Sequence, residues 1–108
     1  MIQDGEVVLG QSYYGINLTD WNLLSGDGDA LRTYEVPIIF PVAFSEAPRL
    51  QVSLGGFYVI GSEPRILVGY ADVGPIGFLL QVSTWGCCRV QGVQANWLAY
   101  DSVSAAVT

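Results

Sequence analysis

The amino-acid sequence predicts an all-β fold, either a β-sandwich or a barrel. Short apolar runs alternate with polar residues at the two-residue period of a strand, and turn residues separate the runs at intervals of about 8–12 residues. No long window shows the period of about 3.6 residues that marks an amphipathic helix. The chain has 108 residues, which is the size of one domain, so we expect residues 1–108 to form a single domain.

Six strands are expected along the chain. The first is a short run at 6–10, and an irregular Gly-, Asn- and Asp-rich stretch follows it, in which Trp21 is expected to plug the core. The second strand, 32–40, contains Pro37, which lacks a backbone donor and therefore favours a sheet edge or a bulge. The other expected strands are 49–54, continued through a bulge at Gly55-Gly56 into 57–60, then 65–73, 77–85 and 93–100.

Several of these runs alternate, and the run 49–54 does so cleanly, with Leu50, Val52 and Leu54 on one face. One face of the run 77–85 carries Phe78, Leu80, Val82 and Thr84, and one face of the run 93–100 carries Val93, Ala95, Trp97 and Ala99. Because successive side chains of a strand point to opposite faces, each set can be buried while its neighbours face solvent. Trp97 is therefore expected to be a core residue.

The charge balance excludes several classes of function. The chain has ten acidic residues, four arginines, no lysine and no histidine, which gives a net charge of −6. Binding to nucleic acid needs a basic stripe, and docking on anionic membranes needs a basic cluster, so neither is expected. Without histidine there is no Ser-His or Cys-His nucleophile pair, and without lysine there is no Schiff base or P-loop. No cofactor is expected.

The cysteines predict neither a disulfide nor a metal site, and the N-terminus does not resemble a leader. Cys87 and Cys88 are adjacent, and a bond between them would strain the intervening peptide, so free thiols are expected. No histidine is present to complete a zinc site with them, and no metal site is expected. The first residues lack the basic and apolar regions of a signal peptide, and no apolar run approaches the roughly 20 residues that span a bilayer. We therefore expect neither a leader nor membrane insertion.

A series of short motifs along nearly the whole chain resembles a known family. In order, the motifs are IQDGEV at 2–7, Phe40, Phe44 and Pro48, RLQVSL at 49–54, PRILV at 64–68, GF at 77–78, STW at 83–85 and NWLAY at 96–100. Their order and spacing resemble the H-type lectin domain. The resemblance implies a six-stranded antiparallel β-sandwich that forms a homotrimer. It also implies binding of galactose or N-acetylgalactosamine glycans at clefts between protomers, and no enzymatic activity.

The resemblance further implies a set of sugar-binding residues. The family's acid before the second strand matches Asp29, its arginine after the long hairpin matches Arg65, and the tryptophan of the neighbouring protomer matches Trp85. Gly86 and Gln91 stand where snail members of the family carry a histidine and a tyrosine. These two departures put the preference for N-acetylgalactosamine in question and leave room for a different sugar or a longer glycan.

The three matched side chains suit sugar recognition chemically. A carboxylate accepts hydrogen bonds from two neighbouring hydroxyls, and a guanidinium donates to two oxygens in a planar fork. An aromatic ring packs against the C–H face of a sugar without covering its hydroxyls. Asp29, Arg65 and Trp85 supply one group of each kind.

Each of these residues also has a structural interpretation. Asp29 suits an ordinary turn, or a calcium site together with Asp27, although the ligand spacing of an EF-hand is missing. Arg65 can pair on the surface with Glu63 or Asp72. A tryptophan at a strand end, such as Trp85, can equally belong to the core or to a subunit interface.

Two other functions compete with a lectin. The first is a structural or receptor-binding module of a trimeric fibre or of a virion- or phage-like spike. The expected lack of a leader fits a component of such a particle, and it also fits a lectin that is released to the exterior without a leader. The second is a glycoside hydrolase, which needs two carboxylates about 5–10 Å apart, and the sequence selects no such pair.

Overall fold

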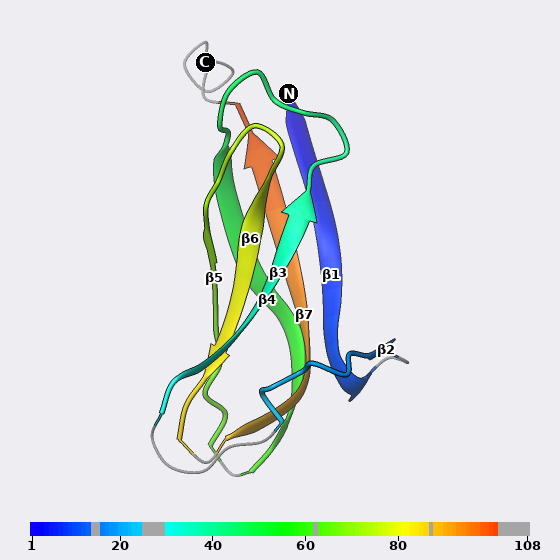
Figure 1. The fold of residues 1–108 in the computed structure, drawn as a ribbon, viewed down its shortest axis with the longest axis vertical. Helices are drawn as coiled ribbons and strands as arrows, with labels where there is room; N and C mark the ends of the chain where they lie inside the picture. Colours follow the sequence, from blue (N-terminus) through cyan, green and yellow to red (C-terminus); the bar gives the residue numbers. More distant parts are fainter. Residues whose placement is uncertain (14–15, 25–29, 62, 87, 102–108) are drawn as a thin grey trace.

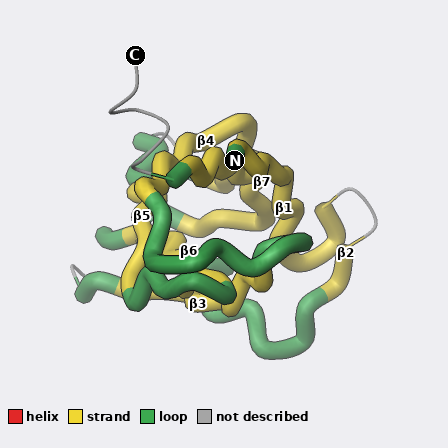
Figure 2. The backbone as a smooth tube through the Cα atoms, turned by 90° about the horizontal axis from the view of Figure 1, so that it is seen from above, coloured by secondary structure: helices red, strands yellow, loops and turns green. Residues whose placement is uncertain are grey.

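The computed structural model describes residues 1–13, 16–24, 30–61, 63–86 and 88–101 as two antiparallel β-sheets packed face to face (Figures 1 and 2). The first sheet has the strand order β2-β1-β7-β4, and the second has the order β3-β6-β5. The strands are β1 (Ile2–Tyr13), β2 (Ile16–Asn17), β3 (Arg32–Ile39), β4 (Arg49–Ile60), β5 (Leu67–Ala71), β6 (Gly77–Thr84) and β7 (Arg89–Tyr100). The predicted six-stranded antiparallel β-sandwich is confirmed, with the two-residue β2 as an addition. No helix among the described residues is long and apolar enough to cross a membrane.

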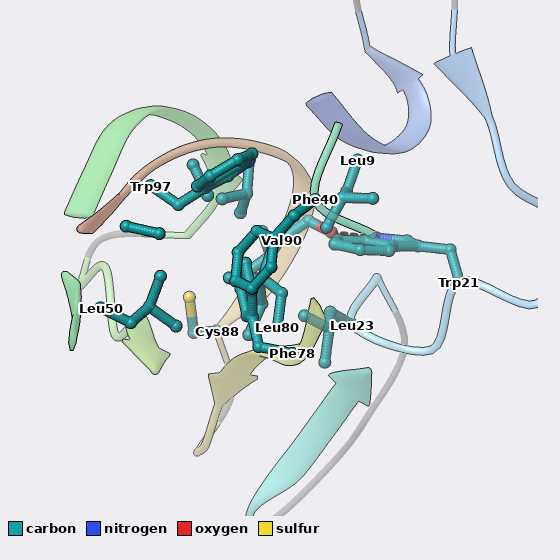
Figure 3. Close-up of a cluster of buried hydrophobic side chains, with 14 of the residues drawn as sticks. Leu9, Trp21, Leu23, Phe40, Leu50, Phe78, Leu80, Cys88, Val90 and Trp97 are labelled. Carbon is teal, nitrogen blue, oxygen red and sulfur yellow. Dashed lines mark hydrogen bonds between the residues drawn. The ribbon is translucent and has the colours of Figure 1, made fainter. Parts of the chain in front are cut away.

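The core lies between the apolar faces of β6 and β7. Every second residue of β6 from Phe78 to Thr84 is buried, and so is every second residue of β7 from Val93 to Ala99. Figure 3 shows Phe78, Leu80 and Trp97 in one cluster with Phe40. The ring centroid of Phe40 lies 5.6 Å from that of Trp97 and 5.8 Å from that of Phe78. The core position of Trp97 is confirmed. Aromatic contacts at these distances add to the free energy gained by burying the rings.

The irregular segment before β3 closes one end of this core. Leu23 is fully buried, and its carbonyl oxygen accepts a hydrogen bond of 2.8 Å from the backbone nitrogen of Val90. The indole nitrogen of Trp21 donates to the carbonyl oxygen of the same Val90 at 2.7 Å, as drawn in Figure 3. The prediction that Trp21 plugs the core is therefore confirmed. Its buried polar atom is satisfied, as a buried indole requires.

Several strand limits differ from the prediction. β1 runs over Ile2–Tyr13 rather than 6–10, because its backbone pairs with β7 from Ile2↔Tyr100 to Gly10↔Gly92 whatever the polarity of its side chains. β7 starts at Arg89 rather than at residue 93, because β4 pairs with it as far as Ile60↔Arg89. Backbone pairing of this kind leaves no trace in an apolar pattern.

Two other predictions about the strands are confirmed, and one strand is shorter than predicted. The register of β4 shifts between Leu54 and Gly56, where a bulge was predicted. Pro37 lies on β3, which is an edge strand. β5 is shorter than the predicted 65–73 because the backbone of Arg65 is bonded to side chains and not to a strand. Its carbonyl oxygen accepts from Thr84 Oγ1 at 2.6 Å, and its nitrogen donates to Cys88 Sγ at 3.5 Å.

The strand ends place several loops at one end of the sandwich. The pair Arg32↔Thr84 joins the start of β3 to the end of β6, and the pair Leu67↔Ser83 puts the start of β5 beside them. The end of β4 meets the start of β7 there as well. In Figure 1 this is the lower end, opposite the N-terminus.

Close packing between β1 and β7 yields a test of the core. A Cβ atom at Gly5 would lie 2.5 Å from ring atoms of Trp97, whereas one at Gly69, in β5, would meet no atom within 4 Å. We expect Gly5→Ala to lower the free energy of unfolding by about 1–3 kcal/mol, because the Trp97 ring must shift. Gly69→Ala should leave it unchanged or slightly higher. Urea denaturation of both variants checks this, and equal stabilities would contradict it.

Candidate functional site

Arg65, Trp85 and Gly86, three of the residues that the sequence singles out, lie beside the strand ends at the lower end of the sandwich in Figure 1. Trp85 and Gly86 follow β6 directly, and Arg65 precedes β5. The structure brings Arg65 and Gly86 together, because a Cβ atom at Gly86 would collide with Nη1 of Arg65. Gln91 lies in β7, where its carbonyl oxygen approaches Gly10 of β1. Asp29 lies outside the described residues.

Arg65 is held by both its backbone and its side chain. Its backbone bonds to Thr84 and Cys88 attach it to the end of β6 and to the loop that leads into β7. Its Nη2 atom forms an ion pair of 2.7 Å with Oε2 of Glu63, so the predicted surface pairing with Glu63 is confirmed. Glu63 is largely exposed, and such a surface pair contributes little to stability. The guanidinium can therefore exchange this partner for another acceptor at little cost.

Gly86 is required by the geometry of this loop. Its φ angle is +69°, in the left-handed region that favours glycine, and the missing side chain leaves the space that Arg65 Nη1 occupies. Sequence comparison alone presents this glycine as the loss of a larger, polar side chain. The structure shows that the same change allows the Arg65 guanidinium to lie directly against the loop backbone.

Trp85 supplies an exposed aromatic ring. The residue is 37% exposed, whereas Trp21 and Trp97 are buried in the core. Its interpretation as a core residue is therefore wrong. Within the described residues, Trp85 is the tryptophan able to offer a ring face to a ligand or to a neighbouring molecule.

Arg32, at the start of β3, was missed by sequence reasoning. Its Nη2 donates to the carbonyl oxygen of Cys88 at 2.7 Å, and its Nη1 donates to that of Gly86 at 3.2 Å. A longer bond of 3.4 Å joins Nη1 to the carbonyl oxygen of Ala30. The only signal in the sequence is that arginine is scarce in this acidic chain. The partners are backbone carbonyls of a distant loop, which no residue pattern reveals.

The titration of Tyr34, beside this end of β3, is shifted. Burial raises the pKa of the Tyr34 phenol, and the hydrogen bond to Asp20 Oδ1, at 3.0 Å, and the negative charge of that carboxylate raise it further. The ring also packs edge-to-face on Trp21 at a centroid distance of 4.9 Å. The phenol therefore stays a neutral donor at physiological pH and helps to hold the segment that closes the core.

Metal and thiol chemistry find little support in the described part of the chain. No group of three or more His, Cys, Asp and Glu side chains is gathered there in a way that could hold a metal ion. The calcium alternative at Asp27 and Asp29 falls outside the described residues. Cys88 is a free, buried thiol, as predicted, and Cys87 also falls outside the described residues.

A groove of about 640 Å³ opens on another part of the molecule, along the β4 and β5 edges of the two sheets. Its lining consists of Gln51, Val52, Ser53, Val68, Gly69, Tyr70, Asn96, Trp97 and Leu98. It contains none of the predicted site residues, so the groove and the candidate site are separate features.

Fold and site together define a β-sandwich with a guanidinium and an exposed indole at one end, which is an arrangement suited to carbohydrate binding. Residues 35–100 match the family model of the H-type lectin domain, well over half of the chain. The chain therefore belongs to the H-type lectin domain family, and its fold is that of a carbohydrate-binding lectin domain. Arg65, Trp85, Gly86 and Gln91 all fall within the matched residues, and Asp29 precedes them.

Comparison with known proteins agrees with this assignment. The fold is similar to two solved structures of discoidin II from Dictyostelium discoideum, one native recombinant and one wild-type, each with a TM-score of 0.75 and 25% identity over 92% of this chain. The chain spans only about a third of the length of discoidin II (36% and 35%). It is also 32% identical over 77 residues to the Fuscovulum blasticum protein named ATP synthase subunits region ORF 7, covering 70% of this chain and 67% of that protein.

The contact between Gly86 and Arg65 gives a test of how tightly this loop is built. We expect Gly86→Ala to lower the free energy of unfolding by about 2–3 kcal/mol, since it combines left-handed strain of roughly 1–2 kcal/mol with displacement of the guanidinium. In an Arg65→Ala background the same change should cost only the strain. A double-mutant cycle by urea denaturation measures the difference. Equal costs in both backgrounds would show that the two residues are not coupled.

Proposed function

We propose that this lectin binds glycans of the galactose or N-acetylgalactosamine type at the lower end of the sandwich in Figure 1. Asp29, Arg65 and Trp85 are the proposed direct contacts, with Gly86 and Gln91 shaping the remainder of the site. The observation that carries the proposal is the Arg65 guanidinium, held against Gly86 at the strand end that presents the exposed ring of Trp85.

The chemistry of recognition follows from these two side chains. Arg65 contributes a planar donor fork whose present acceptor, Glu63, is a weak surface partner that a sugar hydroxyl can replace. Trp85 contributes an apolar ring face for the C–H side of a sugar. Gly86 leaves the space that the Arg65 guanidinium occupies, so the guanidinium lies directly against the loop that follows Trp85.

Replacing Arg65 tests the proposed contact. We expect Arg65→Ala to weaken binding to immobilised galactose and N-acetylgalactosamine by roughly tenfold to a hundredfold, the loss expected for a hydrogen bond from a charged donor. Arg49→Ala is the matched control, since Arg49 is an exposed arginine at the other end of β4. A glycan array followed by titration calorimetry measures both variants, with circular dichroism to verify the fold. Undiminished binding by Arg65→Ala would move the site elsewhere.

We further propose that the domain takes in the whole of residues 1–108. The family match begins at residue 35, but β1 lies before it and pairs with β7 along nine consecutive residue pairs. β7 supplies much of the core, so β1 belongs to the same folding unit.

We also propose that the lectin is a homotrimer, with each sugar site in a cleft between protomers. Support comes from the β4 and β5 edges, where large apolar side chains are exposed beside the groove described above: Leu54, Phe57, Tyr58, Ile60, Leu67 and Tyr70. Exposed edge strands with apolar side chains are a liability that assembly removes. Three sites facing the same way would also raise the avidity of individually weak contacts.

The assembly is testable with a pair of substitutions at opposite edges of one sheet. Leu67 on β5 is 60% exposed and Ile39 on β3 is 66% exposed, so a charge at either position should leave the fold intact. We expect the wild-type protein and Ile39→Glu to have about three times the 11.6 kDa mass of the chain. Leu67→Glu should shift the mass toward that of a monomer. Light scattering after size-exclusion chromatography measures this, and a monomeric wild type would refute the trimer.

A further inference from the structure

Two parts of the chain that are far apart in sequence meet at one guanidinium. Arg32 is the first residue of β3 and pairs in register with Thr84, the last residue of β6. Its side chain extends past this pair into the loop between β6 and β7. There it donates to the carbonyl oxygens of Gly86 and Cys88 at 3.2 and 2.7 Å. A single side chain thus fixes the path of the loop on both sides of residue 87.

We propose that Arg32 is a positioning residue of the sugar site, and that it orients Trp85 and Arg65 by holding the backbone carbonyls of Gly86 and Cys88. The inference rests on the proposed function, since it concerns the same site. Arg32 acts through the loop and need not touch the ligand.

The link from Arg32 to the proposed contacts passes through Gly86. Arg32 holds the carbonyl oxygen of Gly86, and the Arg65 guanidinium lies against the same residue, where any side chain would collide with it. Cys88 links the two arginines as well. Its carbonyl oxygen accepts a hydrogen bond from Arg32, and its sulfur accepts one from the backbone nitrogen of Arg65. If the loop backbone shifts, Arg65 loses its contact with Gly86 and its backbone hydrogen bond to Cys88.

The geometry favours arginine specifically. Two terminal nitrogens in a rigid plane reach two carbonyl oxygens at once, which the single ammonium of a lysine cannot do with the same fixed spacing. The Nε atom of Arg32 is buried without a hydrogen-bond partner among the described residues. Leaving this buried donor unpaired is unfavourable, and the bonds of the two terminal nitrogens to the loop carbonyls offset that cost. The arrangement makes sense when the carbonyls of the loop are what must be held.

The test compares Arg32→Met and Arg32→Lys with Arg49→Met, which removes an arginine from the opposite end of the sandwich. The first measurement is affinity for immobilised galactose and N-acetylgalactosamine under conditions where every variant is folded by circular dichroism. The second is quenching of Trp85 fluorescence by acrylamide. Because Trp21 and Trp97 are buried, their contribution can be subtracted with Trp85→Phe in each background.

We expect Arg32→Met to reduce affinity at least tenfold and to raise the quenching constant of Trp85, with Arg32→Lys between it and the wild type. Arg49→Met should match the wild type in both measurements. Wild-type affinity together with unchanged quenching in Arg32→Met would overturn the inference. Should Arg32→Met fail to fold, Arg32→Lys decides by the same two measurements.

The two proposals can fail separately. If the wild-type protein binds neither sugar, the proposed ligand is wrong, and the quenching of Trp85 alone then decides whether Arg32 holds the loop. If the wild type binds and only Arg65→Ala loses affinity, the site stands and Arg32 is not a positioning residue.

Discussion

The burial of one face of β7 against β6 is the constraint on which the rest of this molecule depends. β7 is paired on both sides, by β1 and by β4, and its inward residues from Val93 to Ala99 lie under the other sheet. From Gly92 to Tyr100, where β7 has a partner on both sides, its backbone donors and acceptors are met by the neighbouring strands, and its register decides which face is buried. Because a shift of one residue would turn Trp97 outward, the register of β7 is strongly determined, and it sets the position of the loop that precedes it.

The candidate site is a consequence of that position. The loop between β6 and β7 must connect two strands in different sheets, and it does so with a glycine in the left-handed region at Gly86. The carbonyl oxygens of such a connection point away from any strand partner and need donors. Arg32 supplies them from the neighbouring strand β3. The same glycine leaves room for Arg65. The loop therefore both connects the two sheets and positions a residue of the candidate site.

Most of the positive charge of the protein lies at the same end of the sandwich as the candidate site. Only four arginines are present in a chain of net charge −6, and Arg32, Arg65 and Arg89 all lie at the site end of the sandwich. Two of them are engaged with protein groups, Arg32 with backbone carbonyls and Arg65 with Glu63. Structural and binding roles therefore share this end of the domain, whereas the apolar edges of β4 and β5 form a separate surface.

Much of this could be predicted from the sequence, and the rest could not, for identifiable reasons. The alternation of Val93, Ala95, Trp97 and Ala99 predicts a buried strand because side-chain direction has a period of two whatever the partner is. The bulge after Leu54 and the edge position of Pro37 follow from local backbone chemistry. The full length of β1 did not follow, because Gln3 and Asp4 join the sheet through their backbones.

The same division holds for the site. Sequence motifs alone identified the family and selected Arg65, Trp85 and Gly86. They could show Gly86 only as the absence of a side chain, since what fills that space is Arg65, 21 residues earlier in the chain. The role of Arg32 was decided by tertiary structure entirely. Its partners are backbone carbonyls, which every residue possesses, so only the folding of β3 beside the end of β6 determines which of them it meets.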